Sequence, residues 1–359
     1  MNKIAELISR LCPDGVEFKT LDSLVSYVQP GPYIVSSTEY DTHYSTPVLT
    51  AGQSFILGYT NEEEGIYNAS SQKPVIIFDD FTTSFHWVDF DFKVKSSALK
   101  ILKIKDKQEA DFRYIYMAMK TIHFIPTNHM RHWISLYSKF EIPLPPLNIQ
   151  KEIVSILDSF TSLIDKMKQE VEMRKKQMEY YLNILICKDN VAARLFGDIG
   201  VVQRGKRVVR KELALQGCIP VFQNSLTPLG YYQYSNIPAN NTFIISAGTA
   251  GEIGFSAKPF WAADDCLVIS SVLCDSKYLY YYLKTQEQFL KSQIRGGAMK
   301  RLSRETIEKL EIPVPSLEKQ HQIASILDTF ETYISKLEKM IELRQKQYEY
   351  YREKLLTFE

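Results

Sequence analysis

The sequence predicts an α+β protein built as a tandem duplication of two mixed α/β domains, each followed by a long helix. The two helices are expected to pair as an antiparallel coiled coil. Three observations predict this class: a long segment recurs later in the chain, both copies carry apolar residues at coiled-coil spacing, and the rest of the sequence holds short β-branched runs bounded by turn residues.

The duplication is visible in two segments that lie 170 residues apart. Residues 141–147 read EIPLPPL and residues 311–317 read EIPVPSL. Of the 46 aligned positions in 141–186, 22 are identical. Upstream of each segment the identity fades, so the copies share a frame but differ between their landmarks. We therefore expect two domains and two helices, with the domains over residues 1–146 and 190–316 and the helices over residues 147–189 and 317–359.

Each domain is expected to hold a buried strand that runs into a polar loop. The strand is Pro74–Phe78 in the first domain and Thr242–Ser246 in the second, and both are short, apolar and β-branched. The loops that follow are Asp79–Thr83 and Ala247–Gly251. A helix is then expected in each copy, over Asp111–Ile122 and Ser276–Lys291.

The recurring segments predict two long helices. Apolar residues alternate at steps of three and four, as in a coiled-coil seam, and a repeated step of four after Met167 predicts one stutter. Prolines break the chain before each helix. Each helix would be roughly 55 to 60 Å long, so its expected partner is the other helix. A plain dimerisation coiled coil explains the same spacing. The predicted seam is Ile153, Ile156, Phe160, Leu163, Met167, Val171, Arg174, Met178, Tyr181 and Leu185, and in the second copy Ile323, Ile326, Phe330, Tyr333, Leu337, Ile341, Arg344, Tyr348, Tyr351 and Leu355.

Composition limits the possible chemistry. The 359 residues carry a formal net charge of only +1, so a nucleic-acid-binding surface needs its charge on one face or a partner that supplies more. The five cysteines are odd in number and none has metal-ligand spacing, which indicates a reduced cytoplasmic compartment and no metal or cofactor. No apolar run approaches roughly 18 residues, so neither secretion nor membrane insertion is supported.

Basic and polar residues in loops are the candidates for DNA contact. At the 170-residue offset, Arg131 falls on Arg301 although their neighbours differ. Arginine can donate two hydrogen bonds to guanine or hold a phosphate, and the alternative is an ordinary surface arginine. A basic stretch after residue 203 would follow phosphates, although such a run is often a solvated face. The candidates are Asn128, Arg131, His132, Thr82 and Thr83 in the first copy, and Arg204, Lys206, Arg207, Thr249, Lys300 and Arg301 in the second.

Catalytic motifs are absent from the sequence. We find no G-x-x-x-x-G-K-[ST] nucleotide loop, no Asn/Asp-Pro-Pro-Tyr run of an amino-methyltransferase and no H-E-x-x-H zinc motif. Gly248–Gly254 has the spacing of a phosphate cradle but contains Glu252. Charged sets that echo metal or nuclease sites are better explained as surface charges on an alternating strand, for Asp89, Asp91, Lys93 and Lys95, and as turn or strand-end residues, for Asp79-Asp80 and Asp264-Asp265.

The order of elements carries a family resemblance. A variable domain, a proline-led long helix, a second variable domain and a second proline-led helix follow one another, with supporting motifs at Cys12–Val16, Lys73–Phe81, Gln150–Ile153 and Gly248–Gly251. Over essentially the whole chain, this arrangement resembles the specificity subunit of type I restriction-modification systems.

The resemblance implies a role in choosing DNA sites. Each domain would be a target recognition domain that reads one half of a split, asymmetric site on double-stranded DNA. The helices would form an antiparallel spacer that docks two methyltransferase subunits, with ATP-dependent restriction motor subunits joining for cleavage. The chain itself would then be non-catalytic. A coiled-coil scaffold without a DNA role, a self-contained methyltransferase and a specificity subunit of a related fused restriction-methylation system remain alternatives.

Overall fold

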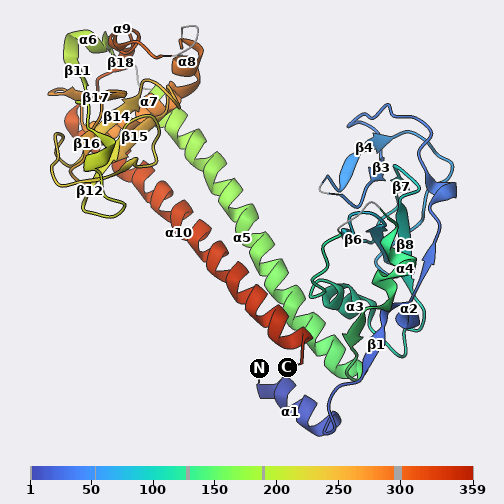
Figure 1. Cartoon of the computed structure of the whole chain (residues 1–359). Helices are drawn as coiled ribbons and strands as arrows, with labels where there is room; N and C mark the ends of the chain where they lie inside the picture. Colours follow the sequence, from blue (N-terminus) through green and yellow to red (C-terminus); the bar gives the residue numbers. More distant parts are fainter. Residues whose placement is uncertain (1, 53, 127–129, 188–190, 295–300, 359) are drawn as a thin grey trace. The chain divides into compact units, whose positions relative to one another are not determined.

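The computed structural model describes residues 2–52, 54–126, 130–187, 191–294 and 301–358. The chain divides into two compact units. Unit 1 comprises Met1–Lys166 and Glu342–Glu359, and unit 2 comprises Met167–Ile341. Each unit therefore contains one sheet-rich domain together with part of each long helix (Figure 1).

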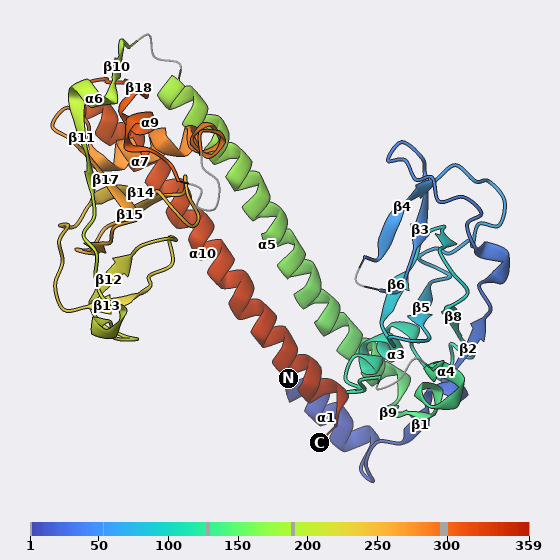
Figure 2. The ribbon, with the colours of Figure 1, turned by 45° about the horizontal axis from the view of Figure 1, so that its top comes forward.

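The domain of unit 1 is built from three small sheets (Figure 2). Its strands are β1 (Phe18–Thr20), β2 (Val25–Val28), β3 (Thr46–Leu49), β4 (Ile56–Thr60), β5 (Val75–Asp79), β6 (Phe85–Val88), β7 (Lys93–Val94), β8 (Leu99–Ile104) and β9 (Glu141–Pro143). Its helices are α1 (Asn2–Leu11), α2 (Leu21–Leu24), η1 (Gly31–Tyr33), α3 (Phe112–Met119), α4 (His132–Ser135) and η2 (Tyr137–Lys139). The strand orders are β2-β8-β5-β6, β4-β3-β7 and β1-β9.

Unit 2 repeats the same strand orders, as β11-β17-β14-β15, β13-β12-β16 and β10-β18. Its strands are β10 (Ala193–Leu195), β11 (Gly200–Arg204), β12 (Ile219–Phe222), β13 (Gly230–Tyr232), β14 (Asn241–Ile245), β15 (Ile253–Ser256), β16 (Trp261–Ala262), β17 (Cys266–Ser271) and β18 (Glu311–Pro313). Its helices are α6 (Phe196–Ile199), η3 (Arg210–Glu212), α7 (Ser276–Thr285), α8 (Glu287–Ser292) and α9 (Arg304–Glu308). The duplication predicted from the sequence is thus a duplication of topology.

The central strand of each domain is buried on both faces. In β5, Val75 and Ile77 pack into one cluster with residues of β7 and β8, while Ile76 and Phe78 pack into another with α3. Successive side chains of a strand point to opposite faces, so an apolar run such as this one contributes to two cores. The predicted strands at 74–78 and 242–246 are confirmed, each shifted by one residue.

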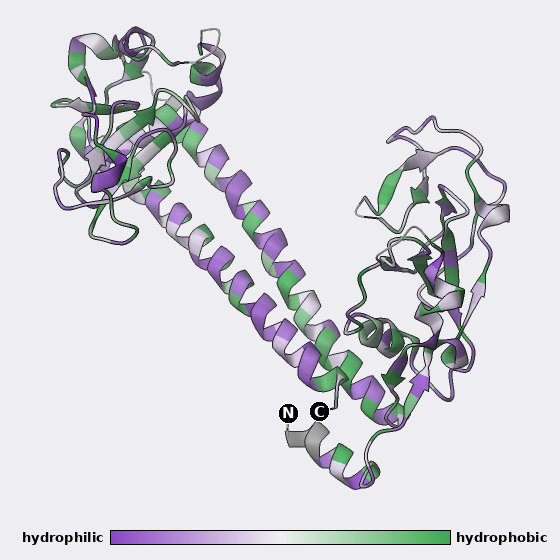
Figure 3. Ribbon diagram, in the orientation of Figure 1, coloured by the Kyte–Doolittle hydropathy of each residue, from purple (hydrophilic) through white to green (hydrophobic). Residues whose placement is uncertain are grey.

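Two long helices, α5 (Leu147–Cys187) and α10 (Leu317–Leu356), carry apolar residues along their length (Figure 3). In unit 1, Leu157 of α5 and Leu355 of α10 belong to one core, and the ring centroids of Phe160 and Tyr351 lie 5.5 Å apart. In unit 2, residues near the middle of both helices cluster, and the ring centroids of Tyr181 and Phe330 lie 5.5 Å apart. The first part of α5 therefore pairs with the last part of α10 and the reverse, so the predicted antiparallel pairing is confirmed.

The predicted stutter is wrong. Leu163, Ile326 and Tyr333, which were assigned to the seam, are 42%, 43% and 41% exposed. Their neighbours Ile164, Leu327 and Ile334 are buried instead, and so is Leu157 beside Ile156. With these residues in place the steps alternate regularly between four and three. The inward-facing positions are 153, 157, 160, 164, 167, 171, 174 and 178 in α5, and 323, 327, 330, 334, 337, 341, 344, 348, 351 and 355 in α10.

Candidate nucleic-acid interface

The candidate residues of unit 2 that the structure describes gather where three strands of the central sheet meet. β14 and β11 end opposite the start of β17, because Ile245 pairs with Cys266 and Arg204 pairs with Leu267. We call this edge, comprising residues 204–207, 246–251, 264–265 and 301, the strand-end edge of unit 2. Loops at such an edge can vary in sequence because the sheet fixes the positions of their two ends.

Arg301 is attached to this edge through its backbone. It forms a β-bridge with Ala247, and the next amide, of Leu302, donates to the carbonyl of Ser246 at 2.9 Å. The exposed guanidinium of Arg301 lies 3.2 Å from Oδ1 of Asp265. Arg204 joins the same edge by donating from Nε to the carbonyl of Asp264 at 2.7 Å. Arg301 and Arg204, two predicted contact residues, therefore lie beside Asp264-Asp265. This acidic pair lies at a strand end, as predicted.

The basic stretch after β11 is held by main-chain contacts that leave its side chains outside. The amides of Gly205 and Lys206 donate to the carbonyls of Cys266 and Ala262, at 2.9 and 2.8 Å. A Cβ at Gly205 would lie 2.1 Å from the carbonyl oxygen of Ala263, so no larger residue fits this approach. Lys206 and Arg207 are both exposed, as phosphate contacts require.

Thr249 lies in a tight turn between Gly248 and Gly251, whose φ angles are +84° and +87°. Its amide donates to the carbonyl of Asn224 at 2.9 Å, and its hydroxyl hydrogen-bonds to the carboxylate of Glu252. A carboxylate inside the turn repels phosphate, so the turn is poorly suited to hold one. Thr249 remains exposed at the edge.

Unit 1 places Arg131 in the same position as Arg301. The amide of His132, the next residue, donates at 2.8 Å to the carbonyl of Asp80, which directly follows β5, just as Leu302 donates to Ser246 after β14. The strand-end edge of unit 1 comprises Gln29 and residues 79–83, 98–100 and 131. Arg131 and Thr82 are exposed on it, and Asp79 accepts from the amides of Phe81 and Thr82 as a turn residue.

Two candidates of the first copy are covered. His132 is 5% exposed and lies against the ring of Phe124, and Thr83 is buried in the turn after β5 with φ at +57°. Their burial argues against direct contact with DNA. Asn128 and Lys300 lie outside the described residues.

Sequence reasoning missed a buried ion pair beneath this edge. Asp80 and Lys100 are each 1% exposed, and Lys100 Nζ lies 3.4 Å from Asp80 Oδ2. Lys100 also donates to Oε1 of Gln29 at 3.2 Å. The period of two in β8 could have indicated that Lys100 is buried, because it places Lys100 on the same inward face as Leu102, but it does not identify Asp80 as the partner.

The reading of residues 89–95 as surface charges is wrong for Lys93. Its side chain is 4% exposed, lies 2.8 Å from a carboxylate oxygen of Glu62 and donates to the carbonyl of Glu64 at 2.6 Å. Asp89 and Asp91 are exposed as expected. Within the described ranges, no group of three or more His, Cys, Asp or Glu side chains could hold a metal ion. None of the helices in those ranges has the length and apolar character needed to span a membrane.

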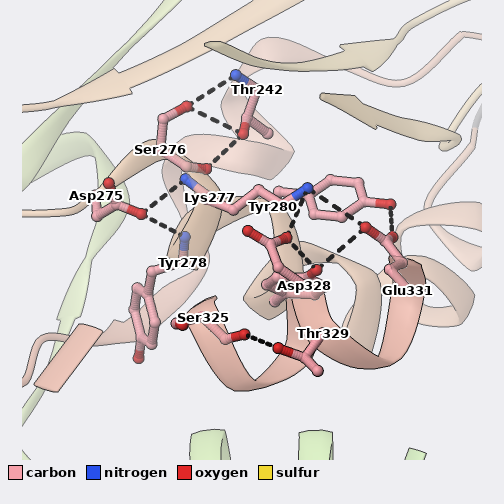
Figure 4. Close-up of polar contacts among 11 residues, drawn as sticks. Thr242, Asp275, Ser276, Lys277, Tyr278, Tyr280, Ser325, Asp328, Thr329 and Glu331 are labelled. Carbon is pink, nitrogen blue, oxygen red and sulfur yellow. Dashed lines mark hydrogen bonds and ion pairs between the residues drawn. The ribbon is translucent and has the colours of Figure 1, made fainter. Parts of the chain in front are cut away.

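A second missed feature is a polar joint that fastens the sheet-rich part of unit 2 to α10 (Figure 4). Lys277 of α7 lies 3.0 Å from Asp328 and 3.4 Å from Glu331, with its Nζ over the rings of aromatic neighbours. The hydroxyls of Tyr280 and Tyr281 donate to Glu331 and Asp328, at 2.7 and 2.6 Å. Burial raises the pKa of both tyrosines far above the usual range, so they remain protonated donors.

The joint is completed by a buried glutamine of α10. Gln320 accepts from the amide of Asp275 at 2.7 Å and donates to the carbonyls of Leu273 and Pro315. Asp275 in turn caps α7, since its carboxylate accepts from the amides of Lys277 and Tyr278. The hydroxyl of Tyr278 donates to the carbonyl of Pro313 at 2.9 Å.

Unit 1 repeats the glutamine, the capping aspartate and the cation of this joint. Gln150 accepts from the amide of Asp111 at 2.8 Å, Asp111 caps α3, and Tyr114 donates to the carbonyl of Pro143 at 2.8 Å. Arg113 replaces Lys277 and pairs with Asp158 at 2.9 Å. Gln150/Gln320 and Asp158/Asp328 are among the positions identical between the repeats. Their identity is explained by this shared attachment of domain to helix.

Comparison with known protein families matches both copies. The model of the type I restriction modification DNA specificity domain matches residues 13–173 and 189–345. The chain is 36% identical to the specificity subunit of the type I restriction enzyme EcoR124I/EcoR124II of Escherichia coli, over 96% of this chain and 95% of that protein. It is 28% identical to a putative type I restriction enzyme specificity subunit of Haemophilus influenzae, over 96% of each.

Solved structures share the fold. A type I restriction-modification S subunit from M. genitalium superposes with a TM-score of 0.71 at 17% identity, covering 95% of this chain and 96% of that one. A chain from a structural study of complex assembly and conformational transition in the type I restriction-modification system gives a TM-score of 0.54 at 13% identity, covering 96% of this chain and 98% of that one. At these identities the likeness concerns the fold alone.

Proposed function

Because the chain belongs to the type I restriction modification DNA specificity family, we propose that it reads a split, asymmetric site on double-stranded DNA. Residues 1–146 read one half-site and residues 190–316 read the other. The chain is a non-catalytic specificity subunit of a type I restriction-modification system. Its partners are two modification subunits, which transfer the methyl group, and ATP-dependent restriction subunits, which translocate and cut DNA.

The observation that carries this proposal is the equivalence of Arg131 and Arg301. Both are exposed, both immediately precede a residue whose amide binds the carbonyl after the central strand, and both belong to domains whose other loop residues differ. Arginine is the side chain that most often reads guanine in the major groove. Two equivalent arginines in divergent surroundings fit two domains that present different base contacts from one frame.

The remaining candidates fit phosphate contact better than base readout. Arg204 donates to a main-chain carbonyl. Lys206 and Arg207 extend from a backbone that is hydrogen-bonded to the sheet. Contacts to phosphates fix register and orientation but carry no sequence information. Thr82 and Thr249, at the two strand-end edges, are short side chains suited to either role. We assign no DNA contact to His132 or Thr83.

Partner docking is supported by apolar side chains that the helix pair leaves uncovered. In unit 2, Ile326, Tyr333 and Met340 of α10 are all more than two-fifths exposed and recur every seven residues. Met173 and Tyr180 of α5 are about three-fifths exposed. Residues seven positions apart lie on one face of a helix, and an apolar row of this kind is a candidate protein-binding surface. We define the first three as the apolar stripe of α10 and assign it to a modification subunit.

The function is tested by expressing the chain with its own modification subunits and sequencing the methylated sites of the host. We expect one motif made of two short, different half-sites separated by an unread spacer. Methylation at a single uninterrupted motif, or without sequence preference, would contradict the proposal. A chain that binds duplex DNA of every sequence equally in the presence of those subunits would also contradict it.

Partner docking has its own test. Glutamate at the stripe, as in Ile326→Glu with Met340→Glu, should prevent co-purification with the modification subunit, because burying an unpaired carboxylate at an interface is costly. Ser335→Glu adds the same side chain at another exposed position of α10 and should leave the complex of two modification subunits per chain intact. Equal co-purification of both variants would remove the stripe from the proposed interface.

A further inference from the structure

Helix α4 begins without a capping side chain of its own. Arg131 occupies the N-cap position, and its side chain makes no cap hydrogen bond. The first amides of a helix need acceptors, which short polar side chains at the N-cap usually provide. Here Asp80 provides both: its carbonyl accepts from the amide of His132 at 2.8 Å, and its Oδ1 accepts from the amide of Trp133 at 2.9 Å.

Asp80 accepts these bonds from a buried position beside Lys100. It is 1% exposed, and its Oδ2 receives no hydrogen bond and faces Lys100 Nζ at 3.4 Å. Lys100, equally buried, is held by Gln29 and lies 5.2 Å from the ring centroid of Tyr27. Removing one partner of a buried pair leaves the other charge without compensation, so the pair acts as one element.

We propose that the buried Asp80–Lys100 pair is a positioning element for Arg131, and so determines how sharply the first half-site is read. The proposal rests on the function proposed above. Because Asp80, at the end of β5, caps α4, the N-cap residue does not have to be a capping residue. An arginine can therefore occupy this position and point outward from a fixed backbone. The base-reading geometry of Arg131 then depends on two residues that never touch DNA.

The second domain reaches the same backbone arrangement without this element. Ser246 stands where Asp80 stands, since the amide of Leu302 donates to its carbonyl. The β14–β17 register pairs Ile244 with Leu267, where the β5–β8 register pairs Phe78 with Lys100. Arg301 is held instead by the carboxylate of Asp265. Substitutions at Asp80 and Lys100 should therefore affect one half-site, and the other serves as an internal control.

The test uses the full chain in complex with its modification subunits and a library of random DNA duplexes, selected by binding and sequenced. Lys100→Met should lower discrimination at the first half-site by roughly 5- to 140-fold, which corresponds to the about 1 to 3 kcal/mol of a bidentate base contact. Arg131→Ala should lower it by a similar factor. Both variants should read the second half-site as the wild type does.

Two further variants separate positioning from loss of a charge. Lys103→Met removes an exposed lysine from the same strand and should change nothing at either half-site. The double variant Asp80→Asn with Lys100→Met should recover most of the lost discrimination, because asparagine Oδ1 still accepts from the amide of Trp133 and no unpaired charge remains buried. A purely charge-based effect of Lys100 would not be rescued in this way.

Four results would overturn the inference. Wild-type discrimination by Lys100→Met, while Arg131→Ala loses it, would leave the proposed function standing but remove the positioning role. An equal loss at both half-sites that the double variant does not rescue would mark a general folding defect. Undiminished discrimination by Arg131→Ala would show that this arginine reads nothing. If the wild-type complex selects no split motif at all, the proposed function fails and the inference fails with it.

Discussion

Replacing Gln320 by alanine should loosen α7 from α10 in unit 2 while leaving unit 1 unchanged. Gln320 is fully buried and holds three main-chain groups: the amide of Asp275 at 2.7 Å and the carbonyls of Leu273 and Pro315 at 3.0 and 2.9 Å. Alanine preserves the helix but leaves these three main-chain groups without the glutamine side chain that they bind. The amide of Asp275 matters most, because its position directs the carboxylate that caps α7.

The expected loss follows from these contacts. A hydrogen bond contributes about 0.5 to 1.5 kcal/mol net, so three of them predict a loss of about 1.5 to 4.5 kcal/mol in the free energy of opening the joint. Gln322→Ala is the matched control: it lies on the same helix, is exposed, and makes one side-chain hydrogen bond at 3.5 Å to Glu318. Exposed substitutions of this kind usually change stability by less than about 0.5 kcal/mol.

Native-state hydrogen exchange followed by mass spectrometry measures both units in one experiment. Peptides that cover α7 should lose protection in Gln320→Ala, whereas peptides that cover α3 should not. The reciprocal variant, Gln150→Ala, should affect α3 and spare α7, since Gln150 makes the equivalent contacts in unit 1. Unchanged protection of α7, or equal loss in both units, would refute the assignment of Gln320 to a local joint.

Further predictions concern readout, spacing and pH. Arg301→Ala should lose about 1 to 3 kcal/mol of discrimination at one half-site in competition binding, and an equal loss on random DNA would identify a phosphate contact instead. If the length of the helix pair sets the distance between the half-sites, deleting Leu163–Gln169 together with Tyr333–Lys339 should shorten the spacer in the methylated motif while both half-sites stay the same. The deletion preserves the seven-residue phase of the seam and removes roughly 10 Å of helix. Altered half-sites with an unchanged spacer would contradict this role of the helices. The hydrogen bond from Lys93 holds the pKa of Glu62 below its ordinary value of 4.5, so the stability that it contributes is complete above that pH and is lost as pH falls through the lowered pKa. Acid unfolding should therefore show a difference between wild type and Glu62→Gln near neutral pH that disappears at low pH, and a constant difference would contradict the pairing.

The register of the helix seam shows how far an apolar pattern can be read. The sequence places two apolar residues side by side at Ile156-Leu157, Leu163-Ile164 and Ile326-Leu327. Spacing alone does not say which of the two faces the partner helix. Choosing the wrong neighbour in the first half of each helix created a stutter that the buried residues do not have. The existence of the helices and their pairing did not depend on that choice, and both were predicted correctly.

Buried polar groups were harder to foresee, because their partners are distant in sequence or belong to the main chain. The identity of Gln150 and Gln320 is visible in the repeat, but the amides and carbonyls that they bind can be known only after folding. Lys93 and Lys100 resemble surface lysines until Glu62 and Asp80 are brought to them by neighbouring segments. The equivalence of two arginines, by contrast, was readable from the repeat offset alone.

The joint that attaches each domain to its helix shares no residue with the strand-end edge of that domain. Substitutions at residues that lie far apart and have no common partner usually act independently. We therefore expect substitutions along one edge to leave the attachment intact, and we expect each helix to accept any domain that has the capping aspartate, the cation two residues later and the tyrosine three residues later. The contacts that hold a domain to its helix are thus separate from the surface that is proposed to meet DNA.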